Sequence, residues 1–284
     1  MTTAIKRKIT DLLIKCIDLK KRGEPMSIQV LVATMNQNDY SLLDKMNIQT
    51  DAIVGNQCDK NEITSFEYKN HSIKWLSFHE KGVGLNRNNT LMRADSDIVM
   101  FADDDMVFID NYEKLIQEAY EKIPEADVII FDLIYPVNQR KPITKIKRLT
   151  ASECMRFGAA RICAKLNSLR INGICFNLCF GGGAQYSSGE DSLFLMDCIR
   201  KGLKVYSYPA IIAKLVERKS SWFVGYNEKF FFDKGVVFSL LFPKMAYVYA
   251  LAHCFKKRKR YVEIGWINAF RQMIKGIRFK NRGL

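Results

Sequence analysis

Short apolar runs rich in β-branched residues recur between residues 27 and 135, and segments of helical length separate several of them. Such runs are typical of strands buried on both faces of a sheet. Their alternation with helices predicts an α/β fold with a mostly parallel mixed sheet flanked by helices. The predicted strands are 27–36, 51–59, 72–78, 97–102 and 127–135, and the predicted helices are 84–94 and 111–123.

A further helix and strand are predicted after a less regular stretch over 136–170. The helix begins near Asp191, with Ser188 as its N-cap, and ends at Gly202. The run "LKVYSYP" over 203–209 follows as a return strand. The sheet is therefore expected to continue beyond residue 135.

Three adjacent carboxylates interrupt the stretch "SDIVMFADDDMVFID" between two apolar runs. They follow the predicted strand 97–102, and ligands of open α/β sheets bind beyond the carboxyl ends of the strands. Adjacent like charges near a buried strand require compensation. Alternate members, Asp103 and Asp105, suit Mg²⁺ or Mn²⁺, which bind oxygen ligands and bridge to nucleotide phosphates. A solvated acidic turn is the alternative.

The same stretch also satisfies the pattern of haloacid-dehalogenase-type phosphatases, in which the first Asp, here Asp103, is a nucleophile. That fold normally has the Asp-bearing strand near its start. Three predicted strands precede it here. This order of elements argues that the match is accidental, and the phosphatase is kept only as the alternative hypothesis.

Three blocks of sequence together give stronger evidence for the function than the aspartate triplet alone. The stretch "KGVGLNRNNTLMRADSDIVMFADDD" places Gly82, Gly84 and the pair Arg87-Asn88 ahead of the aspartates. Together with "LVATMN" before it and "FGGGAQYSSGEDSLFLMDCIRKGLKVYSYP" after it, this stretch resembles the family 2 glycosyltransferases. The resemblance covers residues 27 to about 235, and the three blocks occur in the family's order.

The resemblance implies a fold of the glycosyltransferase A (GT-A) type. It also implies inverting, metal-dependent transfer of a sugar from a nucleotide sugar, with UDP the expected nucleotide, to a hydroxyl of a glycan or lipid-linked acceptor. The implied site comprises Thr34, Asn36, Asn56, Arg87 and Asp103 at the nucleotide, Asp105 and Asp103 at Mn²⁺ or Mg²⁺, and Asp191 and Glu190 in catalysis. At the acceptor we expect Gly182 and Gly183, which let the backbone approach a sugar closely, and Trp222, whose aromatic face suits a sugar. A flexible turn for the glycines and a core or membrane-facing role for Trp222 are the alternatives.

Asp191 is the candidate base that takes the proton of the acceptor hydroxyl, because a helix N-terminus favours an ionised carboxylate. Glu190 is the rival base or a residue that orients the acceptor. Two positions depart from the family pattern: Asn56 stands where an acidic residue usually contacts the base, and no His follows the return strand. Glu217 or a main-chain group is left as the third metal ligand.

The formal charge of +14 belongs to the two ends of the chain. Residues 1–24 carry seven Lys or Arg against three acids, and residues 255–284 carry ten against one, so the middle is nearly neutral. We expect a basic amphipathic helix over 1–24, a catalytic domain over 25–235 and an apolar and basic segment over 236–284. The domain divides into a nucleotide-sugar half, about 25–135, and an acceptor half, about 136–235.

The apolar run 236–255 is about long enough to cross a bilayer. Crossing would place the basic run 256–260 in the cytoplasm and the catalytic domain outside, away from cytosolic nucleotide sugars. We therefore expect peripheral docking on the anionic inner face of the cell membrane, as suits capsule or lipopolysaccharide synthesis in bacteria. Burial of the run in the protein core is the alternative.

Other partners are less favoured by the sequence. No nucleic-acid-reading motif accompanies the basic ends, so nucleic acid is not an expected partner, although a non-catalytic membrane adaptor remains a third hypothesis. The eight cysteines include no CxxC pair and no His placed to complete a zinc site. Free thiols in a reducing cytosol are expected.

Overall fold

The computed structural model describes residues 25–136, 141–217 and 225–280. The helix predicted over 1–24 lies outside the described residues. The strands are β1 Ile28–Met35, β2 Asp51–Gln57, β3 Glu62–Tyr68, β4 His71–Phe78, β5 Ile98–Asp103, β6 Met106–Phe108, β7 Val128–Ile134, β8 Lys147–Arg148, β9 Ile162–Lys165 and β10 Val205–Leu215. The helices are α2 Leu42–Lys45, α3 Val83–Arg93, α4 Tyr112–Lys122, α5 Ala151–Cys154, η1 Ala159–Arg161, α6 Leu166–Ile171, α7 Glu190–Arg200, α8 Glu228–Leu241, α9 Ala246–Lys256, η2 Arg258–Arg260 and α10 Trp266–Lys280.

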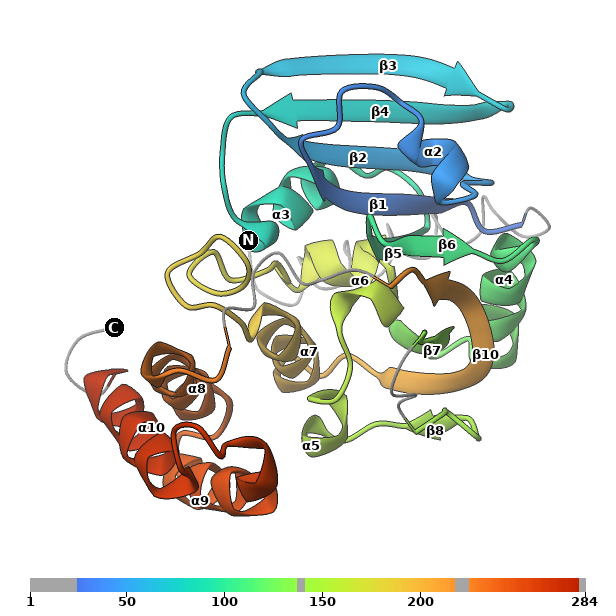
Figure 1. The fold of residues 1–284 in the computed structure, drawn as a ribbon. Coiled ribbons are helices and arrows are strands. Elements are labelled where there is room, and N and C mark those ends of the chain that lie inside the picture. Colours follow the sequence, from blue (N-terminus) through green and yellow to red (C-terminus); the bar gives the residue numbers. More distant parts are fainter. Residues whose placement is uncertain (1–24, 137–140, 218–224, 281–284) are drawn as a thin grey trace, which may run out of the picture.

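One mixed sheet runs through the molecule in the order β3-β4-β2-β1-β5-β9-β7-β10-β6, with β8 paired to β10 (Figure 1). The pairs β4/β2, β2/β1, β1/β5 and β7/β10 are parallel, whereas β9 is antiparallel to both of its neighbours. The predicted α/β fold with a mostly parallel sheet is confirmed. The register sets Ala33 of β1 beside Asp103 of β5, so both strands end at the same edge.

The sequence pattern missed the antiparallel strands β3, β6, β8 and β9. β3 lies at the edge of the sheet, and its mostly exposed, polar residues resemble a loop. The other three have two to four residues each, which is too short for a periodic signal. All six strands predicted from apolar runs are present, with boundaries shifted by a few residues.

Helices cover both faces of the sheet because alternate strand residues point to opposite sides. Val30 and Val32 of β1 join the apolar cluster that includes α2 and α4, and Leu31 joins the cluster that includes α3, α6 and α7. The cap predicted at Ser188 is wrong. Gly189 caps α7, and its φ of 116° is a backbone conformation that a serine rarely adopts.

Helices α8, α9 and α10 form a C-terminal unit beside α7, with an apolar cluster of their own (Figure 1). Helices α8 and α10 approach closely at two glycines. A Cβ at Gly235 would lie 2.1 Å from the Met273 carbonyl oxygen, and one at Gly276 would lie 2.0 Å from that of Phe232. Only glycine fits at either position. The absence of a side chain at Gly235 and Gly276 therefore allows the backbones of α8 and α10 to approach this closely.

The apolar run 236–255 is divided between α8 and α9, and Pro243 lies in the break between them. Most of its α8 residues are buried, whereas several α9 residues are exposed. Within the three described ranges, no helix is both long and apolar enough to cross a membrane. Helix α8 begins at Glu228, so the boundary predicted between 235 and 236 falls inside a helix.

Candidate active site

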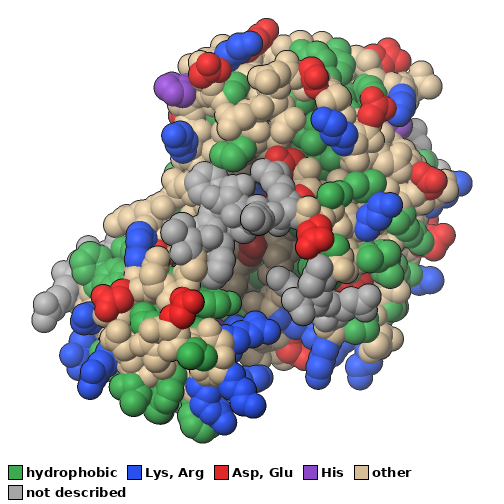
Figure 2. Space-filling view, viewed as in Figure 1, with side chains coloured by type: hydrophobic (Ala, Val, Ile, Leu, Met, Phe, Trp, Pro, Cys, Tyr) green, Lys and Arg blue, Asp and Glu red, His purple; other side chains and the backbone are tan. Residues whose placement is uncertain are grey.

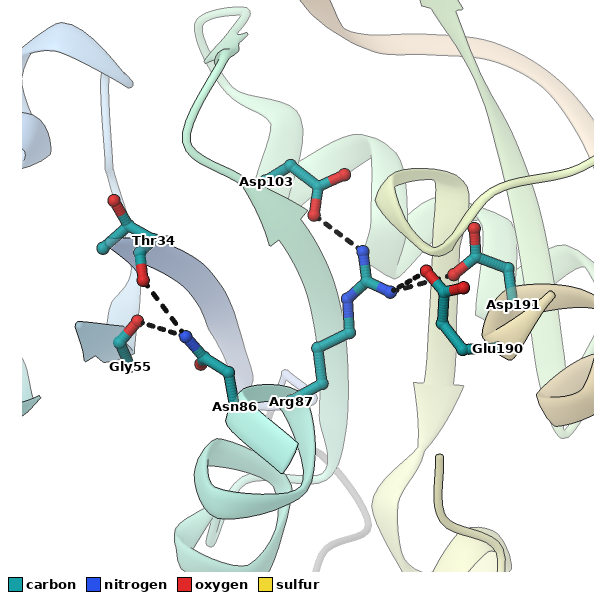
Figure 3. A network of polar contacts seen from close by, with 7 residues as sticks. All are labelled: Thr34, Gly55, Asn86, Arg87, Asp103, Glu190 and Asp191. Carbon is teal, nitrogen blue, oxygen red and sulfur yellow. Dashed lines mark hydrogen bonds and ion pairs between the residues drawn. The ribbon is translucent and has the colours of Figure 1, made fainter. Parts of the chain in front are cut away.

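Arg87 joins three carboxylates at the carboxyl edge of the sheet (Figure 3). Its Nη2 donates to Asp103 Oδ1 at 2.8 Å, and its Nη1 donates to Glu190 Oε1 at 3.2 Å and to Asp191 Oδ1 at 2.9 Å. Only 4% of the Arg87 side chain is exposed. The predicted nucleotide residue Asp103 and the predicted catalytic pair thus belong to one network.

Two neighbours of Arg87 in α3 fix its position. Asn86 Nδ2 donates to the carbonyls of Thr34 at 3.2 Å and Gly55 at 2.7 Å, which ties α3 to β1 and β2. A Cβ at Gly55 would lie 2.0 Å from Asn86 Oδ1, so glycine is required there. Asn88 both donates to the carbonyl and accepts from the N–H of Phe176, at 2.8 Å each.

These asparagines were not predicted as part of the site. Asn86 and Thr90 are buried one helical turn apart, and polar residues on a buried helix face signal specific hydrogen bonds. Gly55 inside a buried strand is likewise a sign of close backbone approach. The polar residues on α3 and the glycine in β2 are visible in the sequence, but the sequence does not show that Asn86 and Gly55 contact each other.

The pKa values of Arg87 and Asp191 are shifted by burial and by the neighbouring charges. Burial lowers the pKa of Arg87, but the carboxylates, Asp103 first, outweigh it and leave the guanidinium firmly charged. Burial, followed by repulsion from Glu190, raises the pKa of Asp191 to about 7, although Arg87 and the backbone N–H of Ala159 oppose the rise. A carboxylate with this proton affinity suits a general base near neutral pH.

The three aspartates at the end of β5 have different partners. Asp103 contacts Arg87 and keeps 39% of its side chain exposed. Asp104, to which the sequence assigned no role, accepts a 2.6 Å hydrogen bond from Thr34 Oγ1. The carbonyl of Asp105 accepts from the N–H of Val216 at 2.8 Å, which brings Glu217, the alternative third metal ligand, next to the triplet in space.

The remaining predicted nucleotide residues lie at the ends of β1 and β2. Asn36 is exposed, and its φ of 55° is left-handed. Asn56 is buried and holds the backbone of Gln37: its Oδ1 accepts from the Gln37 N–H and its Nδ2 donates to the Gln37 carbonyl, both at 3.0 Å. Asn56 therefore holds the backbone of the loop that follows β1.

The predicted acceptor glycines lie between α6 and α7. Gly182 is buried, and its carbonyl accepts from the Val83 N–H at the start of α3, whereas Gly183 is exposed with a φ of 79°. At Gly181, a Cβ would lie 2.9 Å from the Glu190 carboxyl carbon, so glycine is needed to place Glu190. Trp222 lies outside the described residues.

Aspartate side chains near the end of β5 are the candidate ligands for a divalent cation. In the described part of the chain, no three His, Cys, Asp or Glu side chains are arranged to hold a metal ion by themselves. Asp103 and Asp105 still supply two carboxylates at the exposed edge of the sheet, the oxygen ligands that Mg²⁺ and Mn²⁺ prefer. Such ions commonly take their other ligands from water and substrate phosphates. The residues fit a hard divalent cation on those terms.

Comparison with solved structures identifies the fold. The chain is similar to Staphylococcus aureus TarS residues 1–349 in complex with UDP-GlcNAc, with a TM-score of 0.59, 16% identity and coverage of 89% of this chain and 82% of that one. The fold is of the GT-A type. The complex of TarS 1–349 with UDP matches at the same TM-score and identity, covering 89% of this chain and 81% of that one. No protein-family model and no curated protein matches the sequence.

The Arg87 network lies between two parts of this fold. The carboxyl ends of β1, β2 and β5 carry Thr34, Asn56 and Asp103 within residues 25–135, and α7 brings Glu190 and Asp191 from residues 136–235. Arg87 therefore links carboxylates from these two parts of the chain (Figure 3).

Proposed function

We propose that the protein is an inverting, metal-dependent glycosyltransferase of family 2 that uses a UDP-sugar. The observation that carries this proposal is the ionic contact of Arg87 with Asp103 on one side and with Asp191 and Glu190 on the other. The fold neighbours support the choice of donor, since they were solved in complex with UDP-GlcNAc and UDP. The three sequence blocks that carry the family resemblance converge on this network.

The proposed reaction assigns one task to each side chain. Asp191 accepts the proton of the acceptor hydroxyl while the hydroxyl oxygen attacks the anomeric carbon from the face opposite the diphosphate. Glu190 accepts a hydrogen bond from the acceptor and orients it. Arg87 keeps the carboxylates in place and Asp103 contacts the nucleotide. Bound Mg²⁺ or Mn²⁺, held by Asp105 and Asp103, would stabilise the negative charge of the departing diphosphate.

The phosphatase hypothesis has less support. A nucleophilic Asp103 would need a free approach to a phosphorus atom, but its carboxylate contacts the buried Arg87, and the fold is GT-A. A purely structural adaptor would not need an Asp with a pKa near 7 beside a charged Arg at the edge of a parallel sheet.

The proposed donor is tested by thermal shift of the full chain. We expect UDP with Mn²⁺ to raise the melting temperature, and GDP, dTDP and CMP to do so less. A ligand present at 100 times its dissociation constant contributes about 2.7 kcal/mol to stability. Omission of Mn²⁺ should reduce the shift, and Asp105→Asn should reduce it in the presence of Mn²⁺. A shift equal for all four nucleotides would contradict the choice of UDP.

We further propose that the enzyme works at the cytoplasmic face of the cell membrane, on a glycan or lipid-linked acceptor of a bacterial surface polysaccharide. The support is a surface formed by α9, η2 and the residues that follow, here named the α9 surface. Tyr247, Val248, Leu251 and Phe255 are exposed on one side of α9, and Val262 beyond η2 is 79% exposed. The basic run 256–260 adjoins them, and Figure 2 shows Lys and Arg beside apolar side chains over this unit.

Apolar side chains flanked by cations are the combination that binds anionic lipid surfaces. We expect the variant Leu251→Glu/Phe255→Glu to lose sedimentation with vesicles that contain phosphatidylglycerol, because two charges would enter the headgroup region. Ile63→Glu, an equally exposed apolar residue on the edge strand β3, is the matched control and should sediment like the wild type. Binding that survives the double substitution would exclude the α9 surface as the contact.

A further inference from the structure

A pocket that shares no lining residue with the Arg87 network lies beside α5. Its volume is about 430 Å³. The segment 141–149, the end of α5 and one residue of β10 form its walls. The pocket is lined by Lys141, Pro142, Ile143, Thr144, Lys145, Lys147, Leu149, Glu153, Arg156 and Ser207.

Buried polar contacts fix the walls of this pocket. The Ile143 N–H donates to Asp132 Oδ2 at 2.8 Å, and Asp132 forms a buried 2.6 Å ion pair with Arg161. On the other wall, Ser207 Oγ lies 3.3 Å from the Lys145 carbonyl oxygen and 3.4 Å from that of Lys147. The backbone that carries the lysines is therefore anchored to the central sheet before any ligand arrives.

The lining carries an excess of positive charge. Four cations, Lys141, Lys145, Lys147 and Arg156, surround one acid, Glu153, which pairs with Lys147. Within the described residues, no carboxylate pairs with Lys141 or Lys145. Lys and Arg side chains gather along the lower edge of the molecule in Figure 2, where Figure 1 places β8 and α5. Such a pocket favours an anion.

The pocket adjoins the candidate base. Helix α5 packs against α7, and the chain runs on from Arg156 to Gly158 and Ala159. A Cβ at Gly158 would lie 3.3 Å from Asp191 Oδ2. Arg156 is thus two residues from the backbone that touches Asp191. An anionic group in the pocket would belong to the molecule whose hydroxyl faces the base.

We propose that this pocket binds an anionic group of the acceptor, so that the acceptor is an acidic glycan bearing phosphate or carboxylate. The inference rests on the proposed function, because it takes Asp191 as the base that defines the acceptor side. The cations select the charge of the acceptor unit, and the fixed walls limit its size. Phosphate and carboxylate share the chemistry that the pocket offers.

The test is calorimetric titration of the full chain, saturated with UDP and Mn²⁺ so that the donor site is filled. The probes are glucose 6-phosphate, glucuronate and glucose. We expect at least one of the two anions to bind saturably and glucose not to bind, with affinity falling as salt is added. The two anions distinguish phosphate from carboxylate. Equal binding of glucose, or no binding of either anion, would overturn the proposal.

Variants locate the binding. Lys141→Ala/Lys145→Ala should raise the dissociation constant of the anion by about tenfold, since two charge-assisted contacts are lost. Lys114→Ala, an exposed lysine on α4, is the matched control and should bind as the wild type does. Unchanged affinity in the double variant would refute the pocket. The thermal shift with UDP, measured on the same samples, reports the donor site separately, so failure of the proposed function is distinguished.

Discussion

Replacing Asp191 with asparagine should lower kcat for sugar transfer by about a thousandfold, within the range that general-base catalysis contributes. Asparagine has nearly the same shape and can still accept a hydrogen bond from Arg87, but it cannot take the proton of the acceptor hydroxyl. The nucleotide side of the site is unchanged, so the thermal shift with UDP should persist. The measurement is steady-state transfer from a UDP-sugar, with UDP release as the readout.

Glu190→Gln is the matched control, because Glu190 contacts the same Nη1 of Arg87. If Glu190 only orients the acceptor, its amide should raise KM more than it lowers kcat. The reverse result, with Glu190→Gln inactive and Asp191→Asn active, would exchange the two roles and make Glu190 the base.

The pH profile supplies a second measurement of the same assignment. Burial raises the pKa of Asp191 to about 7, and a base works only when deprotonated. In the wild type, kcat/KM should therefore be low at pH 5, rise through pH 7 and level off above it. Asp191→Asn should flatten this limb. A wild-type profile that is level from pH 5 to 8 would show that no group of this pKa controls the reaction.

Much of the fold was predictable because its central strands are buried on both faces. The apolar runs that became β1, β2 and β5 carry their signal in local composition, and parallel pairing follows from their alternation with helices. β9 could not be found in this way. Its four residues enter between β5 and β7 from more than 25 residues beyond β7, and such pairing depends on tertiary contacts that no local window contains.

The sequence predicted several residues of the candidate site and their position at the carboxyl edge of the sheet. The sequence placed Asp103, Arg87 and Asp191 together only through family resemblance, since 104 positions separate Arg87 from Asp191. It did not predict that the Arg87 guanidinium contacts Asp103, Glu190 and Asp191 together, because the direction of the Arg87 side chain depends on the packing of α3 against β1 and β2. For the same reason, the hydrogen bond from Thr34 to Asp104 and the use of Asn56 to hold Gln37 were not foreseen.

Replacing Arg87 with methionine should lower the free energy of unfolding by about 3 kcal/mol at pH 8, as expected when one partner of a buried ionic network is removed. Methionine fills the space of the buried stem but leaves Asp103, Glu190 and Asp191 close together without a cation. The contact between the nucleotide half and α7 would then become repulsive. Urea unfolding followed by circular dichroism measures the difference.

The pH dependence of this loss identifies its cause. Without Arg87, the pKa of Asp191 in the folded state rises further above its value in the unfolded chain, because the guanidinium no longer opposes burial and the repulsion from Glu190. The folded state then binds more protons between those values, so its stability falls as pH rises. Arg87→Met should therefore be much closer to the wild type at pH 5 than at pH 8. Arg93→Met, on the exposed end of the same helix, should show little loss at either pH. A deficit in Arg87→Met that is equal at both values would point to lost packing against Phe176, whose ring centre lies 5.2 Å from the guanidinium, in place of lost charge compensation.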